Sequence, residues 1–486
     1  MTQRHRIDQL QHLQNPNLEL ELPSDEVRRM VEQAVEHVIH HLENISGMPA
    51  ISNENGAELS RQLKESLPDQ GTPLEDILEK LFDDIVPCSF NTVGPGHMGY
   101  IPGGGIIHSA IGDFIANAVN RYTGIWLGAP GLVQLETNVI RWFCNMMRYP
   151  EDALGILTTG GSLANFSAVV AARKDKLPEN FLKGTIYTSD QVHHSITKAA
   201  ILAGFPVDNV RSIPSDNEGR MRLDDLKLGI TTDQNAGYQP FMVVGSAGTT
   251  NTGAVDDLQG IADLIKEQNI WFHVDGAYGA FFMLTETGRN VMAGIEQADS
   301  ITLDPHKGLF LPYGTGALLV RDRDTLRKSH SSHAEYLPPM QEDPDFVDYC
   351  DLSPELTRDF RGLRVWLPIK LHGIQPFRDN LEEKLQLTHW ITEELRKLDN
   401  IEIVAEPQLT VMAFRLNLRG MDIDALNQLN QELLERVLAK KNVILSGTMF
   451  HGIFVIRFCI LSFRTHLDRV QQALDDIKAS IEELTR

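Results

Sequence analysis

Short apolar segments alternate with helical stretches between about residues 86 and 371, and this alternation constrains the fold more than any other feature of the chain. It predicts an α/β domain in which strands joined by helices build a mostly parallel sheet. Most of the segments end in Gly, Ser, Thr or Asp, at the carboxyl ends of strands, where such sheets carry their sites. The six segments expected to form strands are 155–157, 185–188, 241–245, 270–274, 300–303 and 316–320.

The flanking regions suggest two further parts, because 486 residues exceed what one simple core holds. Residues 1–86 contain apolar positions at helical spacing, and these helices have few partners nearby in sequence. We therefore expect them to pack against another domain or subunit. Residues 87–375 form the predicted large domain. Residues 376–486, with strands near 401–405, 411–416 and 454–459, form a predicted smaller α/β domain.

Charge and cysteine usage exclude several classes of protein. The formal net charge of −22 argues against nucleic acid and anionic membranes as partners. The four cysteines form no CxxC pair, which indicates thiols in a reducing compartment. The N-terminus has no apolar run of a signal peptide, and no stretch approaches the roughly 20 apolar residues of a membrane helix. We expect a soluble cytoplasmic protein.

Lys307 stands in the segment TLDPHKGLFLPYGTGALLV, directly after a predicted strand. A lysine half-buried in this way loses solvation, which favours its neutral form and makes it a nucleophile for an aldehyde. A surface loop lysine is the simpler interpretation of this segment alone.

Asp275 ends the strongly apolar segment IWFHVD, where a carboxylate is costly unless it is paired. A pyridinium nitrogen would pair with it, although a helix cap or a metal ligand would also explain the residue. The small residues Gly276 and Ala277 would let a flat ring approach the backbone.

Three more segments present polar groups after strands. The turn GILTTGGSLAN places Gly161 and Ser162 at a helix N-terminus, which suits a phosphate. His193, in SDQVHH, could stack on a flat ring, and Thr250, in GSAGTTNTG, could line one. Each segment has a simpler explanation when it is taken alone, but the segments occur in order at the ends of successive strands.

Together these segments resemble the group II pyridoxal-phosphate amino-acid decarboxylases, the family of aromatic-L-amino-acid, histidine and glutamate decarboxylases. The resemblance implies pyridoxal 5'-phosphate as cofactor, fold type I, and a homodimer with its active site at the subunit boundary. Lys307 resembles the Schiff-base lysine, Asp275 the partner of the pyridine nitrogen, and His193 the histidine stacked on the ring. Further matches are Gly161, Ser162 and His306 at phosphate-binding positions, and Thr250 and Ala277 at ring-contacting positions.

Two other segments bear on the reaction and the substrate. Tyr336 lies in the polar segment 330–346 and resembles the loop tyrosine that helps to protonate the intermediate after carbon dioxide leaves. Family members with Phe at this position tend to form an aldehyde instead. In GPGHMGYIPGGG, Tyr100 and Pro102 match the family's substrate clamp, whereas His97 and Met98 stand where aromatic side chains are usual. An aromatic L-amino acid is the favoured substrate.

Three further patterns have simpler explanations. The GxGxxG match at 94–99 follows no strand and contains a proline, so it does not indicate a dinucleotide site. Asn165-Phe166-Ser167 matches a glycosylation acceptor inside a helix of a protein expected in the cytoplasm. His330 and His333 lack supporting metal ligands, so no metal is expected.

The residues alone leave three alternatives to decarboxylation. An aminotransferase of the same fold would give a keto acid instead of carbon dioxide. A carbon–carbon lyase acting on a sphingoid or similar substrate would use the same cofactor. A non-catalytic scaffold could keep the fold without the reaction.

Overall fold

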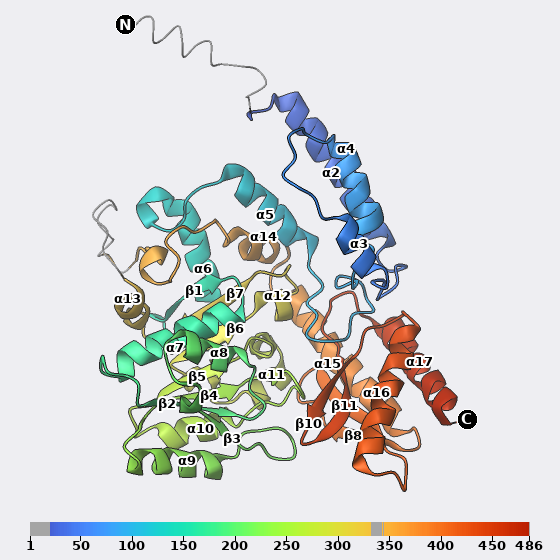
Figure 1. Ribbon diagram of the computed structural model, residues 1–486. Coiled ribbons are helices and arrows are strands. Elements are labelled where there is room, and N and C mark those ends of the chain that lie inside the picture. Colours follow the sequence, from blue (N-terminus) through green and yellow to red (C-terminus); the bar gives the residue numbers. More distant parts are fainter. Residues whose placement is uncertain (1–19, 332–342, 344, 486) are drawn as a thin grey trace, which may run out of the picture. The chain divides into compact units, whose positions relative to one another are not determined.

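The computed structural model describes residues 20–331, 343 and 345–485, which fall into two compact units divided after Asn91 (Figure 1). The first unit is helical. Its helices are α2 (Ser24–Asn44), α3 (Gly56–Gln62), α4 (Leu74–Glu79) and a π-helical segment (Lys80–Ile85). The ring of His37, in helix α2, stacks on that of Phe82, in the π-helical segment, at 5.3 Å between the ring centroids, which joins these two elements.

A seven-stranded sheet forms the centre of the second unit, in the order β1-β7-β6-β5-β4-β2-β3. Strand β7 runs antiparallel to β1 and β6, and the other neighbouring pairs are parallel, which confirms the predicted mostly parallel sheet. The strands are β1 (Leu154–Thr158), β2 (Gly184–Ser189), β3 (Val210–Ile213), β4 (Gln239–Ser246), β5 (Trp271–Asp275), β6 (Ser300–Leu303) and β7 (Gly316–Val320). All six expected strands form, and β3 adds an edge strand that the sequence did not indicate.

Helices cover this sheet, and α7 contacts five of its strands, β1 and β4 to β7. Every residue of β1, β2, β5, β6 and β7 is buried, which explains why these strands show no strict alternation of apolar and polar residues. The helices of this part are α5 (Ile107–Val119), α6 (Pro130–Met146), α7 (Gly161–Lys176), α8 (Ser195–Leu202), α9 (Leu223–Asn235), α10 (Leu258–Ile265), α11 (Glu286–Val291), α12 (Pro305–Gly308), α13 (Asp324–His330) and α14 (Leu363–His372).

A smaller antiparallel sheet follows in the same unit, in the order β10-β11-β9-β8. Its core contains Phe414, Phe458 and Met98, so a residue from the glycine-rich segment 94–105 is buried here. Its elements are α15 (Gln375–Arg396), β8 (Ile401–Ala405), β9 (Val411–Leu416), α16 (Ile423–Ala439), β10 (Ser446–Phe450), β11 (Ile453–Cys459) and α17 (Leu467–Thr485). The domain boundaries at residues 86 and 375 remain predictions.

Within the described ranges, no helix combines the length and the apolar character that a membrane span requires.

Candidate active site

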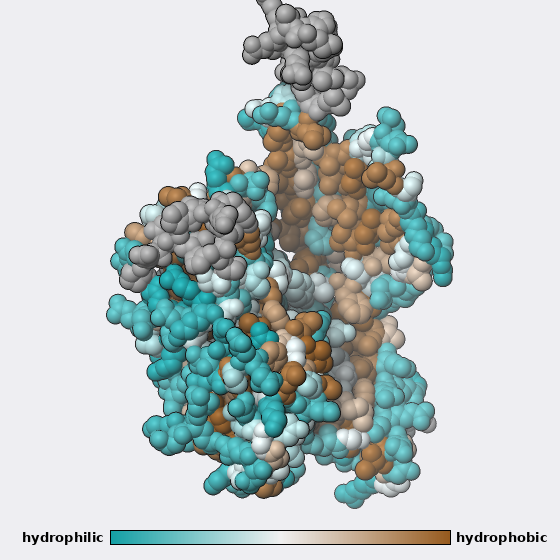
Figure 2. Space-filling view, turned by 60° about the vertical axis from the view of Figure 1, so that its left-hand side comes forward, coloured by the Kyte–Doolittle hydropathy of each residue, from teal (hydrophilic) through white to brown (hydrophobic). Residues whose placement is uncertain are grey.

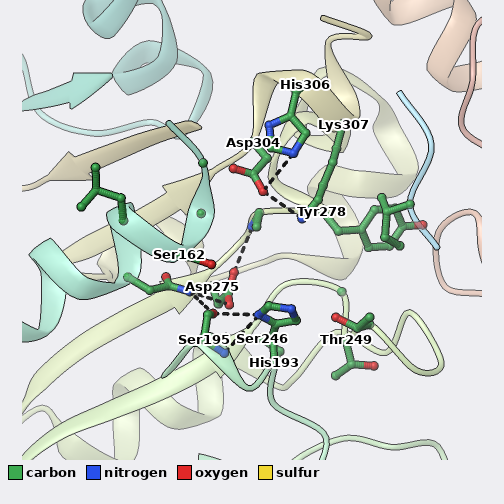
Figure 3. A pocket seen from close by; sticks show the side chains of 18 of the residues that line it. Ser162, His193, Ser195, Ser246, Thr249, Asp275, Tyr278, Asp304, His306 and Lys307 are labelled. Carbon is green, nitrogen blue, oxygen red and sulfur yellow. Dashed lines mark hydrogen bonds and ion pairs between the residues drawn. The ribbon is translucent and has the colours of Figure 1, made fainter. Parts of the chain in front are cut away.

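A pocket of about 310 Å³ lies at the carboxyl ends of β1, β2, β4, β5 and β6 (Figure 3). The turns after these strands carry the side chains that the sequence singled out. Eight predicted residues line this one pocket: Gly161, Ser162, His193, Thr250, Asp275, Ala277, His306 and Lys307. The sheet therefore brings together segments that are up to about 150 residues apart in the chain.

Lys307 lies in α12, a single helical turn that follows β6. Its Nζ atom lies 2.8 Å from Oδ2 of Asp304, and both side chains face the pocket in Figure 3. The other carboxylate oxygen, Oδ1 of Asp304, is buried without a hydrogen-bond partner. The turn itself is closed by the backbone N–H of Lys307, which donates to the carbonyl of Asp304 at 2.8 Å. The amine of Lys307 is therefore fixed by Asp304 and faces the cavity.

The glycine-rich segment 94–105 contacts the helical turn α12 that carries Lys307. A methyl group at Gly103 would overlap the carbonyl oxygen of His306, so only glycine allows the two backbones to approach so closely. The backbone N–H of Ile106 donates to the carbonyl of Phe310 at 2.8 Å, which ties the two segments together. Gly103 therefore packs against the lysine turn.

His306 is fixed by a hydrogen bond of 2.6 Å between its Nδ1 and the carbonyl oxygen of Thr315. A carbonyl only accepts, so Nδ1 carries the hydrogen and Nε2 faces the side of the pocket where Asp304 lies, 3.7 Å away. Burial lowers the pKa of His306, and the nearby Asp304 carboxylate opposes this effect.

The N-terminus of α7 forms the opposite wall. Gly160 precedes the helix with a φ of 152°, a value that favours glycine, and no side chain caps this end. The first N–H groups of an α-helix have no partners inside the helix and carry a partial positive charge. With Gly161 and Ser162 lining the pocket, this end suits an anion such as a phosphate.

Asp275 is the last residue of β5 and is buried, with 8% of its surface exposed. Its Oδ2 accepts a hydrogen bond from Nδ2 of Asn165 at 3.0 Å, and its Oδ1 accepts one from the backbone N–H of Ala277 at 3.2 Å. Among the described residues, no lysine or arginine forms an ion pair with it. A buried carboxylate with neutral partners suits a cationic donor from a ligand.

His193 lies in the turn after β2, half-buried at the pocket. Its Nδ1 lies 2.8 Å from Oγ of Ser195. Burial lowers the pKa of His193, and the carboxylate of Asp275 partly opposes this effect. The ring is therefore mostly neutral at neutral pH.

The remaining walls include residues that the sequence did not single out: Ile101, Asn165, Ser195, Tyr278 and Asp304. The phenol oxygen of Tyr278 is bound to Oγ1 and the backbone N–H of Thr410, at 2.8 and 2.7 Å. Asp304 stands inside the quoted segment TLDPHKGLFLPYGTGALLV, and Tyr278 directly follows Gly276 and Ala277, so their neighbours already pointed to them.

The predicted substrate residues lie differently. Tyr100 is 58% exposed and Pro102 is buried, and neither lines the pocket, whereas Ile101 between them does. Tyr336 lies outside the described residues. The substrate roles of Tyr100 and Pro102, and the role of Tyr336, therefore stay predictions.

Comparison with known proteins identifies the family. Residues 57–417 match the family model described as the pyridoxal-dependent decarboxylase conserved domain. The chain belongs to this family. An aromatic-L-amino-acid decarboxylase of Bacillus atrophaeus is 32% identical to this decarboxylase over 468 residues, which cover 96% of the chain and 98% of the relative. A phenylacetaldehyde synthase of Petunia hybrida is 28% identical and covers 92% of the chain and 93% of its own length.

A solved structure shows the same fold. The crystal structure of Oryza sativa TDC with PLP and tryptamine has a TM-score of 0.92 to this decarboxylase at 26% identity. The match covers 96% of this chain and 100% of the other. It confirms the α/β fold that the strand pattern predicts.

The pocket of this decarboxylase fits pyridoxal phosphate. The pocket offers a lysine amine, an uncapped helix N-terminus and a buried carboxylate without a cationic partner, and these groups suit the aldehyde, the phosphate and the ring nitrogen of that cofactor. The buried, unpartnered Oδ1 of Asp304 is a further sign that the pocket is built around a polar group.

Proposed function

We propose that this decarboxylase converts an aromatic L-amino acid to its amine and carbon dioxide. The observation that carries the proposal is the charge of the pocket: among the described residues that line it there is no arginine, and its lysine is paired with Asp304. An acidic substrate side chain would lack a cation to bind. Relatives named for aromatic substrates support the same conclusion.

In the proposed mechanism, pyridoxal phosphate supplies a protonated ring that accepts the electron pair released when the carboxylate leaves. Lys307 would hold the cofactor through Nζ, and the amino group of the substrate would bind at the same place. Asp275 would keep the ring nitrogen protonated. His193 would contact the ring, and the N-terminus of α7 would hold the phosphate.

The proton that replaces the lost carboxylate is assigned to Tyr336, on the strength of the family resemblance. A phenol holds its proton at neutral pH and can deliver it inside a closed site. The relative named phenylacetaldehyde synthase makes aldehyde formation the second candidate reaction. The family match favours decarboxylation over the aminotransferase, carbon–carbon lyase and scaffold alternatives.

The test is a panel of L-amino acids that contains tryptophan, tyrosine, phenylalanine, histidine and glutamate, with carbon dioxide, amine and aldehyde measured together. We expect an aromatic amino acid to react fastest, with equal amounts of amine and carbon dioxide. Fastest turnover of glutamate would contradict the substrate proposal. Lys307→Arg serves as the inactive control, because it keeps the charge beside Asp304.

We also propose a homodimer with the active site at the subunit boundary. None of the 21 residues of α2 is buried, and Figure 2 shows apolar side chains gathered in the upper part of the view. The exposed apolar side chains of the first unit include Val27, Val35, Val38, Ile39, Ile77 and Leu81, and those of α5 in the second unit are Ile111, Phe114, Ile115 and Val119. Exposed apolar faces on each of the two units, taken separately, suit subunit interfaces.

Sedimentation tests the dimer. Phe114→Glu should shift the protein from dimer to monomer and lower its activity, because the charge would be buried at the interface. Leu228→Glu, at a similarly exposed position on α9, should change neither. A parent protein that stays a fully active monomer across dilution would contradict the proposal. We propose the cytoplasm as its compartment, since the four cysteines are all free thiols.

A further inference from the structure

Asn165 lies at the centre of a buried hydrogen-bonded network behind the pocket. It stands in the first turns of α7 with 1% of its surface exposed. Its Nδ2 donates to Oδ2 of Asp275 at 3.0 Å and to Oγ of Ser195 at 2.9 Å. Its Oδ1 accepts from Oγ1 of Thr302 at 2.7 Å and is 3.0 Å from Nε2 of His273. One amide thus uses both of its hydrogens and both of its acceptor positions.

The direction of each bond follows from chemistry. The carboxylate of Asp275 only accepts, so the Nδ2 of Asn165 must face it and Oδ1 must face His273. Burial lowers the pKa of His273 to about 4, so this ring is neutral and has one N–H. That hydrogen lies on Nε2, which donates to Asn165.

The far end of the network agrees with this assignment. Nε1 of Trp271 donates to Oγ of Ser300 at 2.8 Å, so the hydroxyl of Ser300 is free to donate to Nδ1 of His273, 2.7 Å away. Nδ1 of His273 is thereby an acceptor, as a neutral ring with its hydrogen on Nε2 requires.

The network ends at His193. Oγ of Ser195 accepts from Asn165, so its own hydrogen is free for Nδ1 of His193 at 2.8 Å. The backbone N–H of Ser195 points at the same nitrogen, at 3.3 Å. Two donors therefore face Nδ1, and the hydrogen of the neutral ring lies on Nε2. Figure 3 shows the side chain of Ser195 joined to His193 by a dashed line, with Asp275 beside them.

We propose that Asn165 is a positioning residue that sets both the orientation of the Asp275 carboxylate and the tautomer of His193. This proposal rests on the proposed roles of Asp275 and His193 toward the cofactor. No smaller or charged side chain replaces the amide: alanine supplies no hydrogens, and aspartate would place a second acceptor against Asp275.

The first measurement needs no cofactor. The ¹⁵N resonances of the His193 ring, assigned by their loss in His193→Gln, should show an unprotonated Nδ1 and a protonated Nε2 in the parent protein. In Asn165→Ala the hydroxyl of Ser195 loses its donor, so the two tautomers should mix and the two resonances should move toward each other. A parent protein with its hydrogen on Nδ1 overturns the proposal even if no variant folds.

The second measurement is the dissociation constant of pyridoxal phosphate, from titration of the apoprotein followed by absorbance. Asn165→Ala and Asn165→Asp should weaken binding by about 10-fold to 100-fold, because the hydrogen bond that orients a charged group is lost. Ser167→Ala is the matched control. Its hydroxyl is buried in the same helix without a partner, so its removal should leave the binding and the His193 resonances unchanged.

The outcomes separate the two proposals. Parental binding and parental His193 resonances in Asn165→Ala would show that the network is only structural. Equal losses in Ser167→Ala would show that any change in α7 has this effect, which also overturns the positioning role. A parent protein that fails to bind pyridoxal phosphate would instead contradict the proposed function.

Discussion

Nζ of Lys307 lies 2.8 Å from Oδ2 of Asp304, three residues earlier in the same turn. The side chain of Asp304 is 4% exposed and that of Lys307 is 23% exposed, so the carboxylate anchors an amine that reaches into the pocket. This arrangement separates two properties of the lysine, its charge and its reactivity.

Lys307→Arg should keep the ion pair with Asp304 and abolish covalent attachment of the cofactor. A guanidinium stays protonated and does not condense with the aldehyde. Borohydride reduction followed by peptide mass spectrometry should place the pyridoxyl group on Lys307 in the parent and nowhere in the variant. Lys198→Arg, at an exposed position on α8, should keep the label. A label on another lysine would disprove the assignment.

Gly103→Ala should destabilise the protein and loosen the cofactor, since the added methyl group overlaps the carbonyl oxygen of His306. Overpacking of this kind typically costs about 1–3 kcal/mol. Gly131→Ala is the control, because a methyl group there meets no atom within 4 Å and lies in helix α6. Thermal unfolding and cofactor retention on gel filtration measure the two effects. Equal melting temperatures for both variants would refute the tight contact.

Glu136→Gln should lower the free energy of unfolding by about 3 kcal/mol or more, because it leaves a buried guanidinium without its counter-charge. Glu136 and Arg358 are both fully buried and lie 2.7 Å apart, and Arg358 also lies over the ring of Tyr349. The exposed pair Glu432 and Arg436 provides the comparison, and Glu432→Gln should leave the urea midpoint nearly unchanged. A similar midpoint for both variants would contradict the prediction.

His97→Phe should reduce the loss of the free energy of unfolding that occurs as the pH falls below 6.5. Burial lowers the pKa of His97 to about 4, although the backbone of Thr92 partly offsets it, and neither ring nitrogen has a partner of ordinary geometry. Below pH 6.5 the side chain of His97 takes up a proton in the unfolded chain but not in the folded protein. The free energy of unfolding therefore falls as the pH drops from 6.5 to about 4. The loss is about 3 kcal/mol.

Urea unfolding at pH 7 and pH 4.5 measures this slope. Part of it should remain in His97→Phe, since burial also lowers the pKa of His273 to about 4. The same substitution at the exposed His389 should leave the slope unchanged. If His97→Phe leaves the pH dependence of the free energy of unfolding unaltered, the ring of His97 is protonated as readily in the folded protein as in the unfolded chain.

Tyr336→Phe should lower amine release by about 10²–10⁴-fold, the usual contribution of a general acid. Loss of carbon dioxide should continue. Dioxygen should be consumed as the oxidant, and aldehyde and hydrogen peroxide should be formed. Amine, aldehyde and carbon dioxide are assayed together, with Tyr238→Phe as the control. Amine formation at the parental rate would make Tyr336 a bystander.

The sequence predicted most of the large sheet because β1, β2, β5, β6 and β7 are buried at every position. Asp275 and Lys307 stand out where β5 and β6 end. Strand β3 was missed because it is an edge strand with Arg211 and Ser212 at its centre. Strand β10 was missed because two of its five residues, Gly447 and Met449, are exposed.

Asn165 shows what sequence reasoning could not find. Its only local signal was the glycosylation pattern, which its burial makes irrelevant. Its partners Asp275, His273 and Thr302 lie on strands more than 100 residues later. A helix packed across several strands creates such contacts, and no local periodicity records them.

The antiparallel strand β7 determines at which stage of folding the pocket can form. The segment that carries Lys307 joins β6 to β7, and β7 completes its pairing only against β1, where Val320 meets Leu154. A nascent chain that ends before Val320 has the lysine but lacks the strand that closes its turn. Contacts this distant in the chain form late in folding. If Lys307 binds the cofactor as proposed, we expect covalent loading to follow folding of the large sheet, so that cofactor capture would report a complete sheet.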